Sequence, residues 1–215
     1  MKILVFDDNE INRQAAKAQL ADHDLTVVST YDKAQNLVTP TIDWELYGKL
    51  KKNRFGDKDP IGEDRNALIK KATKYPDFDA VLVDLLVPAS RQQQGPAGLR
   101  LAGQEMPVGV FIALLAAKNG VKHVAVFTDR SHHDHPASAC LDAFNDESFT
   151  VEGNKVILCS GGIWISSFDP NDLGKELDFK ESINRDDKIY AKNWRKLLDD
   201  LIGRKETSNV YRGAY

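Results

Sequence analysis

Three aspartates and one threonine stand where the chain could do chemistry. Asp7 and Asp8 follow the apolar run ILVF, Asp84 interrupts the run VLVDLLVP, and Thr128 closes HVAVFT. Buried carboxylates that lie together repel each other unless a cation or a proton relieves the repulsion. Carboxylate oxygens are the ligands that Mg²⁺ prefers. These residues predict a magnesium site, with the Thr128 hydroxyl able to donate to an anion held beside the metal. The alternative is that Asp84 only caps a neighbouring loop.

The elements that must position these residues alternate between apolar runs and helix-like segments. We expect strands at 2–6, 25–30, 79–87, 123–128 and 155–160, and helices at 12–22, 64–75, 108–120, 135–144 and 190–203. Strands without in/out alternation, separated by helices, indicate a parallel sheet covered on both faces. The prediction is an α/β fold with a doubly wound, five-stranded parallel sheet that binds its ligand beyond the carboxyl ends of the strands. In the last helix one face is expected to carry Tyr190, Trp194, Leu197, Leu198 and Leu201.

The composition is that of a globular protein with no unusual charge. The chain has 215 residues, of which 42% are hydrophobic and 28% charged, and its net charge is -3. No basic field marks it as a direct binder of nucleic acid. Cys140 and Cys159 form no CxxC pair, which is typical of reduced thiols. No signal segment or apolar stretch of membrane-spanning length is present, so we expect a cytoplasmic protein without a membrane partner.

The length exceeds what the five-stranded core needs. We expect one domain over 1–203, with surplus residues at 32–63, 89–107 and 161–189, and a polar tail at 204–215. In this strand assignment each surplus segment follows a strand and precedes a helix. All three are therefore expected to leave the edge of the sheet that carries the aspartates. Long loops there predict a lid or a partner surface, the alternative being insertions without fixed structure.

A histidine-rich stretch, TDRSHHDHP, follows the fourth strand. His132, His133 and His135 could bind a transition metal or accept a phosphate. Consecutive histidines do not converge on one ion, however, and no second cluster completes the ligand set. Ser131 followed by Asp134 has the spacing of a capping box that starts a helix, which is the interpretation we favour.

The chain resembles a known family at three places. The segments are FDDNEINR (6–13), DFDAVLVDLLVP (77–88) and VAVFTD (124–129), and they resemble the receiver domain of two-component response regulators. The shared features are the acidic pair ending the first strand, Asp84 with Pro88 four residues later, and Thr128. Gly109 resembles the glycine that opens the third helix of these receivers. The resemblance implies a receiver-like, flavodoxin-like fold with helices on both faces.

The resemblance also assigns roles. Asp84 would accept a phosphoryl group from the phosphohistidine of a histidine kinase or phosphotransfer protein. Asp7 and Asp8 would position Mg²⁺, Asp8 more directly, and the backbone carbonyl of Leu86 would complete the protein ligands. Thr128 would hydrogen-bond the phosphoryl group. The implied function is that of a stand-alone signalling protein, a phosphoacceptor rather than a turnover enzyme, whose output is contact with a downstream protein.

Two departures from the family leave an alternative open. Receivers carry a lysine at the end of the fifth strand, where this chain has Cys159 and Ser160. Asp129 adds a negative charge directly after the strand-four threonine. Arg130 is the nearest cation in sequence that could replace the lysine. Without such a cation, the chain would be a pseudo-receiver that binds a protein partner and is not phosphorylated.

An enzyme is the third alternative. Phosphatases of the haloacid-dehalogenase kind also begin with a strand that ends in aspartate, and they carry a second aspartate two residues later. Here Asn9 stands two residues after Asp7, and Glu10 stands two residues after Asp8. No GxGxxG or GxxxxGK[ST] pattern occurs either, which disfavours dinucleotide and P-loop nucleotide binding.

Overall fold

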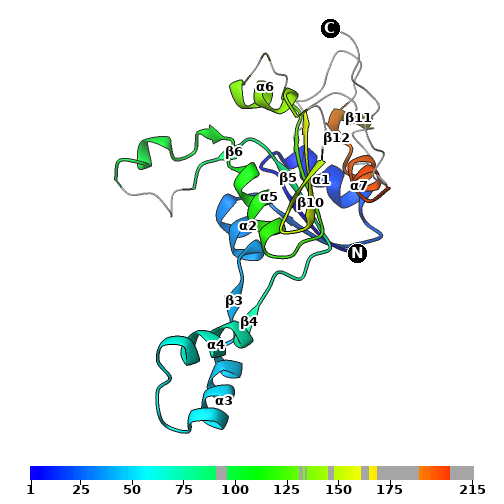
Figure 1. The fold of residues 1–215 in the computed structure, drawn as a ribbon. Helices are drawn as coiled ribbons and strands as arrows, with labels where there is room; N and C mark the ends of the chain where they lie inside the picture. The colour runs from blue at the N-terminus through cyan, green and yellow to red at the C-terminus, as the bar shows by residue number, and fades with distance from the viewer. Residues whose placement is uncertain are drawn as a thin grey trace.

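A six-stranded sheet forms the centre of the molecule in a computed structural model that describes residues 1–90, 96–130, 133, 135–144, 148–160, 165–168 and 189–203 (Figure 1). From edge to edge the strands are β2 (Asp24–Val28), β1 (Lys2–Phe6), β5 (Ala80–Asp84), β8 (His123–Thr128), β10 (Asn154–Ser160) and β9 (Ser148–Val151). The first five are parallel and β9 is antiparallel to β10. Counted along the chain, the parallel strands stand in the order 2-1-3-4-5, which is compatible with a flavodoxin-like fold.

Helices lie on both faces of this sheet (Figure 1). One buried cluster joins the sheet to α1 (Glu10–Gln19) and α7 (Trp194–Gly203). The other joins it to α2 (Tyr31–Val38), α5 (Gly109–Lys118) and α6 (Pro136–Asp142). Alternate residues of one strand serve different clusters, since Ile3 belongs to the first and Leu4 to the second. Both faces are buried, which is why the strands read as unbroken apolar runs.

The five predicted strands are present and parallel, but the sheet has a sixth that was not predicted. β9 and β10 form a hairpin whose turn contains Glu152 and Gly153, both with positive φ (51° and 82°). Two left-handed residues in succession are typical of the tight turns that join antiparallel strands. The sequence signature of such a turn is Asn or Asp before the glycine. Glu152 stands at that position here, so the signature is absent and the turn was not predicted.

A pair of helices, α3 (Trp44–Phe55) and α4 (Gly62–Ala72), forms an arm that extends away from the sheet (Figure 1). Two short strands, β3 (Thr41–Ile42) and β4 (Thr73–Lys74), pair antiparallel at its base. No residue of α3 is buried, and neither of the two sheet clusters includes a residue of the arm. The arm is therefore a separate small unit that adds nothing to the central core.

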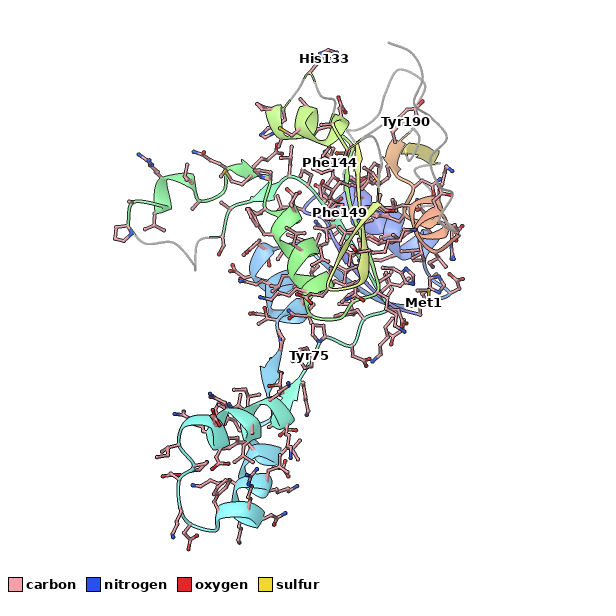
Figure 2. All side chains as sticks on the ribbon, in the orientation of Figure 1. Met1, Tyr75, His133, Phe144, Phe149 and Tyr190 are labelled. Carbon is pink, nitrogen blue, oxygen red and sulfur yellow. The ribbon has the colours of Figure 1, made fainter. Side chains whose placement is uncertain are left out.

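The expected position of segment 32–63 was wrong. α2 begins at Tyr31, directly after β2, so the inserted arm follows a helix instead of a strand. Because α2 carries the chain back along the sheet, the arm leaves near the start of β1, and Figure 2 shows Tyr75 at its neck. The arm therefore lies at the edge of the sheet opposite to the aspartates.

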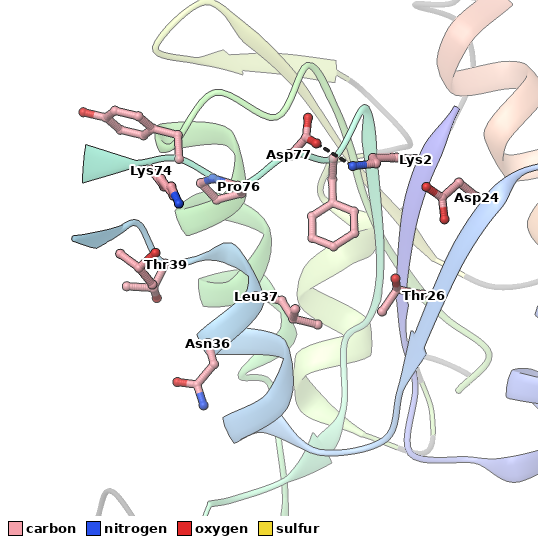
Figure 3. Close-up of a pocket in the computed structure, with 12 residues that line it drawn as sticks. Lys2, Asp24, Thr26, Asn36, Leu37, Thr39, Lys74, Pro76 and Asp77 are labelled. Atoms are coloured by element: carbon pink, nitrogen blue, oxygen red, sulfur yellow. Dashed lines mark hydrogen bonds and ion pairs between the residues drawn. The ribbon is translucent and has the colours of Figure 1, made fainter. Parts of the chain in front are cut away.

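A cavity of about 420 Å³ lies where the arm joins the body (Figure 3). Its wall includes Lys2 and Lys74, together with residues from β2 and the end of α2. Lys2 forms an ion pair with Asp77, and Lys74 Nζ lies 2.8 Å from Asp43 Oδ2. Both lysines are thus already neutralised, and none of the predicted site residues lines this cavity.

Two further strand pairs flank the sheet. β6 (Val87–Pro88) pairs with β7 (Glu105–Met106), and between them lies the short 3-10 helix η1 (Leu99–Leu101). β11 (Ile165–Phe168) pairs with β12 (Ile189–Lys192). The described residues of the surplus segment 89–107 thus belong largely to the hairpin of β6 and β7. Most of segment 161–189, and the predicted tail 204–215, lie outside the described residues. In the described part of the chain, the helices are all too short or too polar to cross a bilayer.

The start predicted for the last helix was wrong. α7 begins at Trp194, and the preceding residues form β12. The apolar face of α7 is as predicted, with Trp194 and Leu197 among its buried residues. Tyr190 instead stands on the strand and is 46% exposed. Two residues further along the strand, Lys192 is fully buried.

Candidate functional site

The three predicted metal-binding carboxylates come together at the carboxyl ends of two adjacent strands. In the parallel register Phe6 of β1 lies opposite Val83 of β5, so Asp7, Asp8 and Asp84 follow at the same edge. One carboxylate oxygen from each lies within 4.8 Å of the others. This edge is the switch point of the strand order, where ligands bind in open α/β sheets.

A cleft of about 530 Å³ opens over this edge. Its wall is strongly acidic and contains a single basic residue in its described lining. The lining residues are Asp8, Asn9, Asn12, Asp84, Leu86, Glu105, Asp129, Arg130 and Tyr190. Such a wall attracts cations, and an anion can enter only if cations accompany or face it.

Asp7 is the fixed member of the acidic cluster. It is fully buried, and its Oδ1 accepts hydrogen bonds from the Asn9 backbone N–H at 2.8 Å and from Asn12 Nδ2 at 3.5 Å. The guanidinium of Arg13 donates to the backbone carbonyls of both Asp7 and Asp8. These bonds hold the backbone of the turn after β1 and the side chain of Asp7 in place.

Lys192 places a cation among the buried aspartates. Its Nζ lies 2.8 Å from Asp7 Oδ2 and 2.8 Å from Asp84 Oδ1. The side chain is completely buried, with its ammonium 5.3 Å from the centre of the Phe127 ring and 5.4 Å from that of Trp194. A lysine is tolerated there because carboxylates and aromatic faces replace its hydration shell.

Asn12 fastens the strand that carries Lys192 to the rest of the site. Its side-chain oxygen accepts a hydrogen bond from the Lys192 backbone N–H at 3.0 Å, and its Nδ2 donates to Asp129 Oδ2 at 3.0 Å. Its backbone carbonyl accepts from Trp194 Nε1 at 2.8 Å. One buried asparagine thus joins α1, β12 and the turn after β8.

Burial raises the pKa of Asp84 to about 8. The attraction of Lys192 offsets this only in part, and the charge on Asp7 adds to it. Lys192 Nζ lies 2.8 Å from Asp84 Oδ1, so the ammonium directly faces the carboxyl whose pKa it lowers. The Asp84 side chain is nearly buried, with the residue 6% exposed, and it lines the cleft.

The pKa values of the neighbouring groups change in directions that are set by burial and by the charges around them. Burial raises the pKa of Asp7 against the opposing effect of Lys192, and burial followed by the charge on Asp7 raises that of Asp8. Burial alone would raise the pKa of Asp129, but Lys192 and the Asn12 hydrogen bond together lower it. Burial alone would lower the pKa of Lys192, but Asp7, Asp84 and Asp129 raise it. Lys192 is therefore a permanent cation.

The raised pKa of Asp84 predicts a pH dependence of stability. Between about pH 4 and 8 the folded chain holds a proton that the unfolded chain, with an ordinary pKa of 3.8, has released. The free energy of unfolding therefore falls as pH rises through this window, by at most about 1.4 kcal/mol per unit. Urea denaturation at pH 5, 6, 7 and 8 measures the slope. Asp84→Asn should flatten it, and equal slopes for the two proteins would contradict the assignment.

The donor set has the chemistry that Mg²⁺ prefers, because one carboxylate oxygen from each of Asp7, Asp8 and Asp84 lies within 4.8 Å of the others. Both oxygens of Asp7 are already engaged by Asn9 and Lys192. Asp8 and Asp84 are therefore the residues with oxygens free to hold the ion. Leu86 lines the cleft two residues after Asp84, and ligation by its carbonyl stays a prediction.

Thr128 and Arg130 lie at the end of β8, and their hydrogen-bond partners are protein groups. The sequence predicted a bound phosphoryl group as their partner. Thr128 is fully buried, and its Oγ1 accepts a hydrogen bond from the Arg130 backbone N–H at 3.2 Å. The described lining of the cleft does not include it. Arg130 lines the cleft, and its guanidinium Nη2 lies 2.9 Å from Glu105 Oε1. Contact of Thr128 with a phosphoryl group stays a prediction.

The helix after the histidine-rich stretch starts differently from the prediction. α6 begins at Pro136, and the capping residue is His135, whose Nδ1 accepts a hydrogen bond from the Ala137 backbone N–H at 3.1 Å. His135 is thus the cap of α6, while a metal role of the histidines stays a prediction. His133 lies at the same end of the molecule as Tyr190 (Figure 2). His132, Ser131 and Asp134 lie outside the described residues.

Sequence reasoning missed Lys192, Asn12, Glu105 and Tyr190. Lys192 contacts residues 185 positions away, and nothing in its local sequence IYAKNW sets it apart from any other lysine. Asn12 lies in the acidic motif after β1, and its position one turn after Asp8 on α1 was the available signal. Comparison with family models, with curated proteins and with solved structures gave no match to this chain.

Proposed function

We propose that the protein is a receiver-like phosphoacceptor, with Asp84 as the acceptor and Lys192 as the cation that receivers otherwise carry on their fifth strand. The observation that carries the proposal is the ammonium of Lys192, 2.8 Å from both Asp7 and Asp84. In this proposal the fold is that of a doubly wound receiver, in agreement with the sheet order and with the helices on both faces. It makes the protein a cytoplasmic partner of a histidine kinase or phosphotransfer protein.

The arrangement supplies what phosphoryl transfer requires, namely positioning and neutralisation of charge. An oxygen of Asp84 attacks the phosphorus, the bond to the donor nitrogen breaks, and the acyl phosphate remains on Asp84. Lys192 faces the oxygens at the acceptor and counters their charge. Asn9, Asn12 and Arg13 keep the acidic turn in place. Bound Mg²⁺, held by Asp8 and Asp84, would offset the repulsion between the carboxylates and the incoming phosphoryl group.

The test is the intact mass of the full chain after incubation with acetyl phosphate and Mg²⁺. We expect a gain of one phosphoryl group that is absent from Asp84→Asn and lost when EDTA removes the metal. Addition to Asp84→Asn as well, or no addition to a folded wild type at pH 8, would contradict the proposal.

One observation favours the pseudo-receiver as a second candidate. Asp8, Glu105 and Asp129 face the same cleft as Asp84, and their charge opposes the entry of a phosphoryl group. In that case Lys192 would serve only to neutralise the buried aspartates, and the cleft would bind a partner through its acidic rim. A wild type that binds Mg²⁺ tightly but gains no mass would favour this candidate.

A further inference from the structure

Arg130 differs from the other cation of the site in its freedom to move. Lys192 is completely buried and contacts two carboxylates, so its ammonium group is held in one position. The side chain of Arg130 is 51% exposed and, among the described residues, makes one ion pair, to Glu105, whose side chain is 43% exposed. Exposed pairs of this kind are weak, and their partners exchange readily.

The ion pair joins two segments that otherwise touch little. Arg130 stands just after β8, with its backbone fixed by the hydrogen bond to Thr128 Oγ1. Glu105 belongs to β7, which lies opposite Pro88 of β6. This hairpin starts directly after β5 and Asp84, and it is extended by the bonds from Ala89 N–H to the Gln104 carbonyl and from Gly103 N–H to the Ala89 carbonyl. The contact thus ties the hairpin to the mouth of the cleft.

We propose that Arg130 is a switching cation, which leaves Glu105 for an anion on Asp84 and so frees the β6–β7 hairpin to act as the output element. This inference rests on the proposed phosphoacceptor function. Arg130 is the only basic residue in the described lining of the cleft, so among the described residues it is the mobile cation closest to an anion on Asp84.

The competition between the two partners of Arg130 favours the phosphoryl group. A phosphoryl group carries about two negative charges and three acceptor oxygens, against one charge on Glu105. The planar guanidinium matches phosphate oxygens with two parallel hydrogen bonds, whereas its pair with Glu105 is held through one nitrogen. Once Arg130 has moved, Glu105 shares the cleft with Asp8 and has lost its cation. Repulsion between these carboxylates then favours displacement of the hairpin.

Hydrogen exchange of the full-length protein tests this inference. The measured quantity is the exchange rate of the Ala89 and Gly103 amides, before and after phosphorylation with acetyl phosphate and Mg²⁺. We expect exchange to become about two- to fivefold faster on phosphorylation, the effect of losing one exposed ion pair. Arg130→Ala and Glu105→Gln should exchange at the faster rate already without phosphate, with no further change on phosphorylation.

A matched control is Arg54→Ala, which removes an exposed arginine from a pair with Asp64 of the same length, 2.9 Å, on the arm. It should leave the hairpin amides as they are in the wild type. A phosphorylated wild type with unchanged hairpin exchange, or Glu105→Gln with wild-type exchange, would overturn the switching role alone. A wild type that accepts no phosphoryl group would overturn the phosphoacceptor function, and the switch with it.

Discussion

Replacing Lys192 with methionine is expected to lower the free energy of unfolding by about 3–5 kcal/mol at pH 8, the cost of leaving a buried charge without its partner. Methionine is similar in length and apolar, so the change removes the ammonium with little loss of packing. Asp7 and Asp84 would then stand buried with no cation, and they would take up protons instead. Urea denaturation measures the loss, and the intact-mass assay should show that phosphoryl acceptance disappears.

The pH dependence of this loss separates a lost ion pair from a general packing defect. At pH 5 the aspartates are protonated more easily, so Lys192→Met should cost less than at pH 8. Lys49→Met is the matched control, because Lys49 pairs with Glu45 on the exposed surface of the arm. It should change stability by less than about 0.5 kcal/mol. A Lys192→Met protein as stable as the wild type would show that Lys192 does not neutralise the aspartates.

Substituting Gly109 with alanine is expected to destabilise the protein by at least about 2 kcal/mol, since a methyl group has no room there. A Cβ on Gly109 would lie 2.8 Å from the carbonyl carbon of Asp84 and would overlap the carbonyl oxygen. The helix starts so close to β5 that the Gly109 N–H donates to the Leu85 carbonyl at 3.2 Å. Relief of the clash must move either α5 or the backbone of Asp84.

Gly48→Ala provides the opposite result in the same assay. Gly48 also lies in a helix, α3, but a Cβ there would meet no atom within 4 Å. Alanine should raise the free energy of unfolding by about 0.4–1 kcal/mol, because it restricts the unfolded chain. Thermal or urea denaturation of both variants checks the pair. Equal effects at the two positions would contradict the close contact of α5 with β5.

The parts of the fold that were predictable are those whose pattern is local. The run Ile3–Phe6 is fully buried, as an unbroken apolar segment in a covered sheet must be. Once β1 and β5 are recognised as parallel neighbours, Asp7 and Asp84 meet by geometry alone. The histidine cap and the β9 turn are also local, but several residue types can satisfy them. Their sequences therefore indicate a turn or a helix start without identifying the residue that forms it.

The parts that were not predictable depend on contacts far apart in the chain. Lys192 reaches Asp7 only because β12 and α7 fold back across α1, and no local property of the strand indicates this contact.

The helical arm was not predicted for a different reason. Half of the residues of α3 are polar or charged and none is buried, so the helix lacks the continuous apolar face that predicts packing on a core.

The paired strands at the base of the arm allow the arm to be replaced without a change in the rest of the fold. Thr41 and Lys74 are cross-strand partners, so the chain leaves the body and returns to it at neighbouring points. A helical arm or a short turn at this position would leave the sheet unchanged. The entropic cost of closing the loop rises only slowly with the length of the loop. A lineage could lengthen, shorten or exchange the arm while the aspartates at the far edge stay in register. The arm can thus vary without any change in the geometry of the acidic cluster.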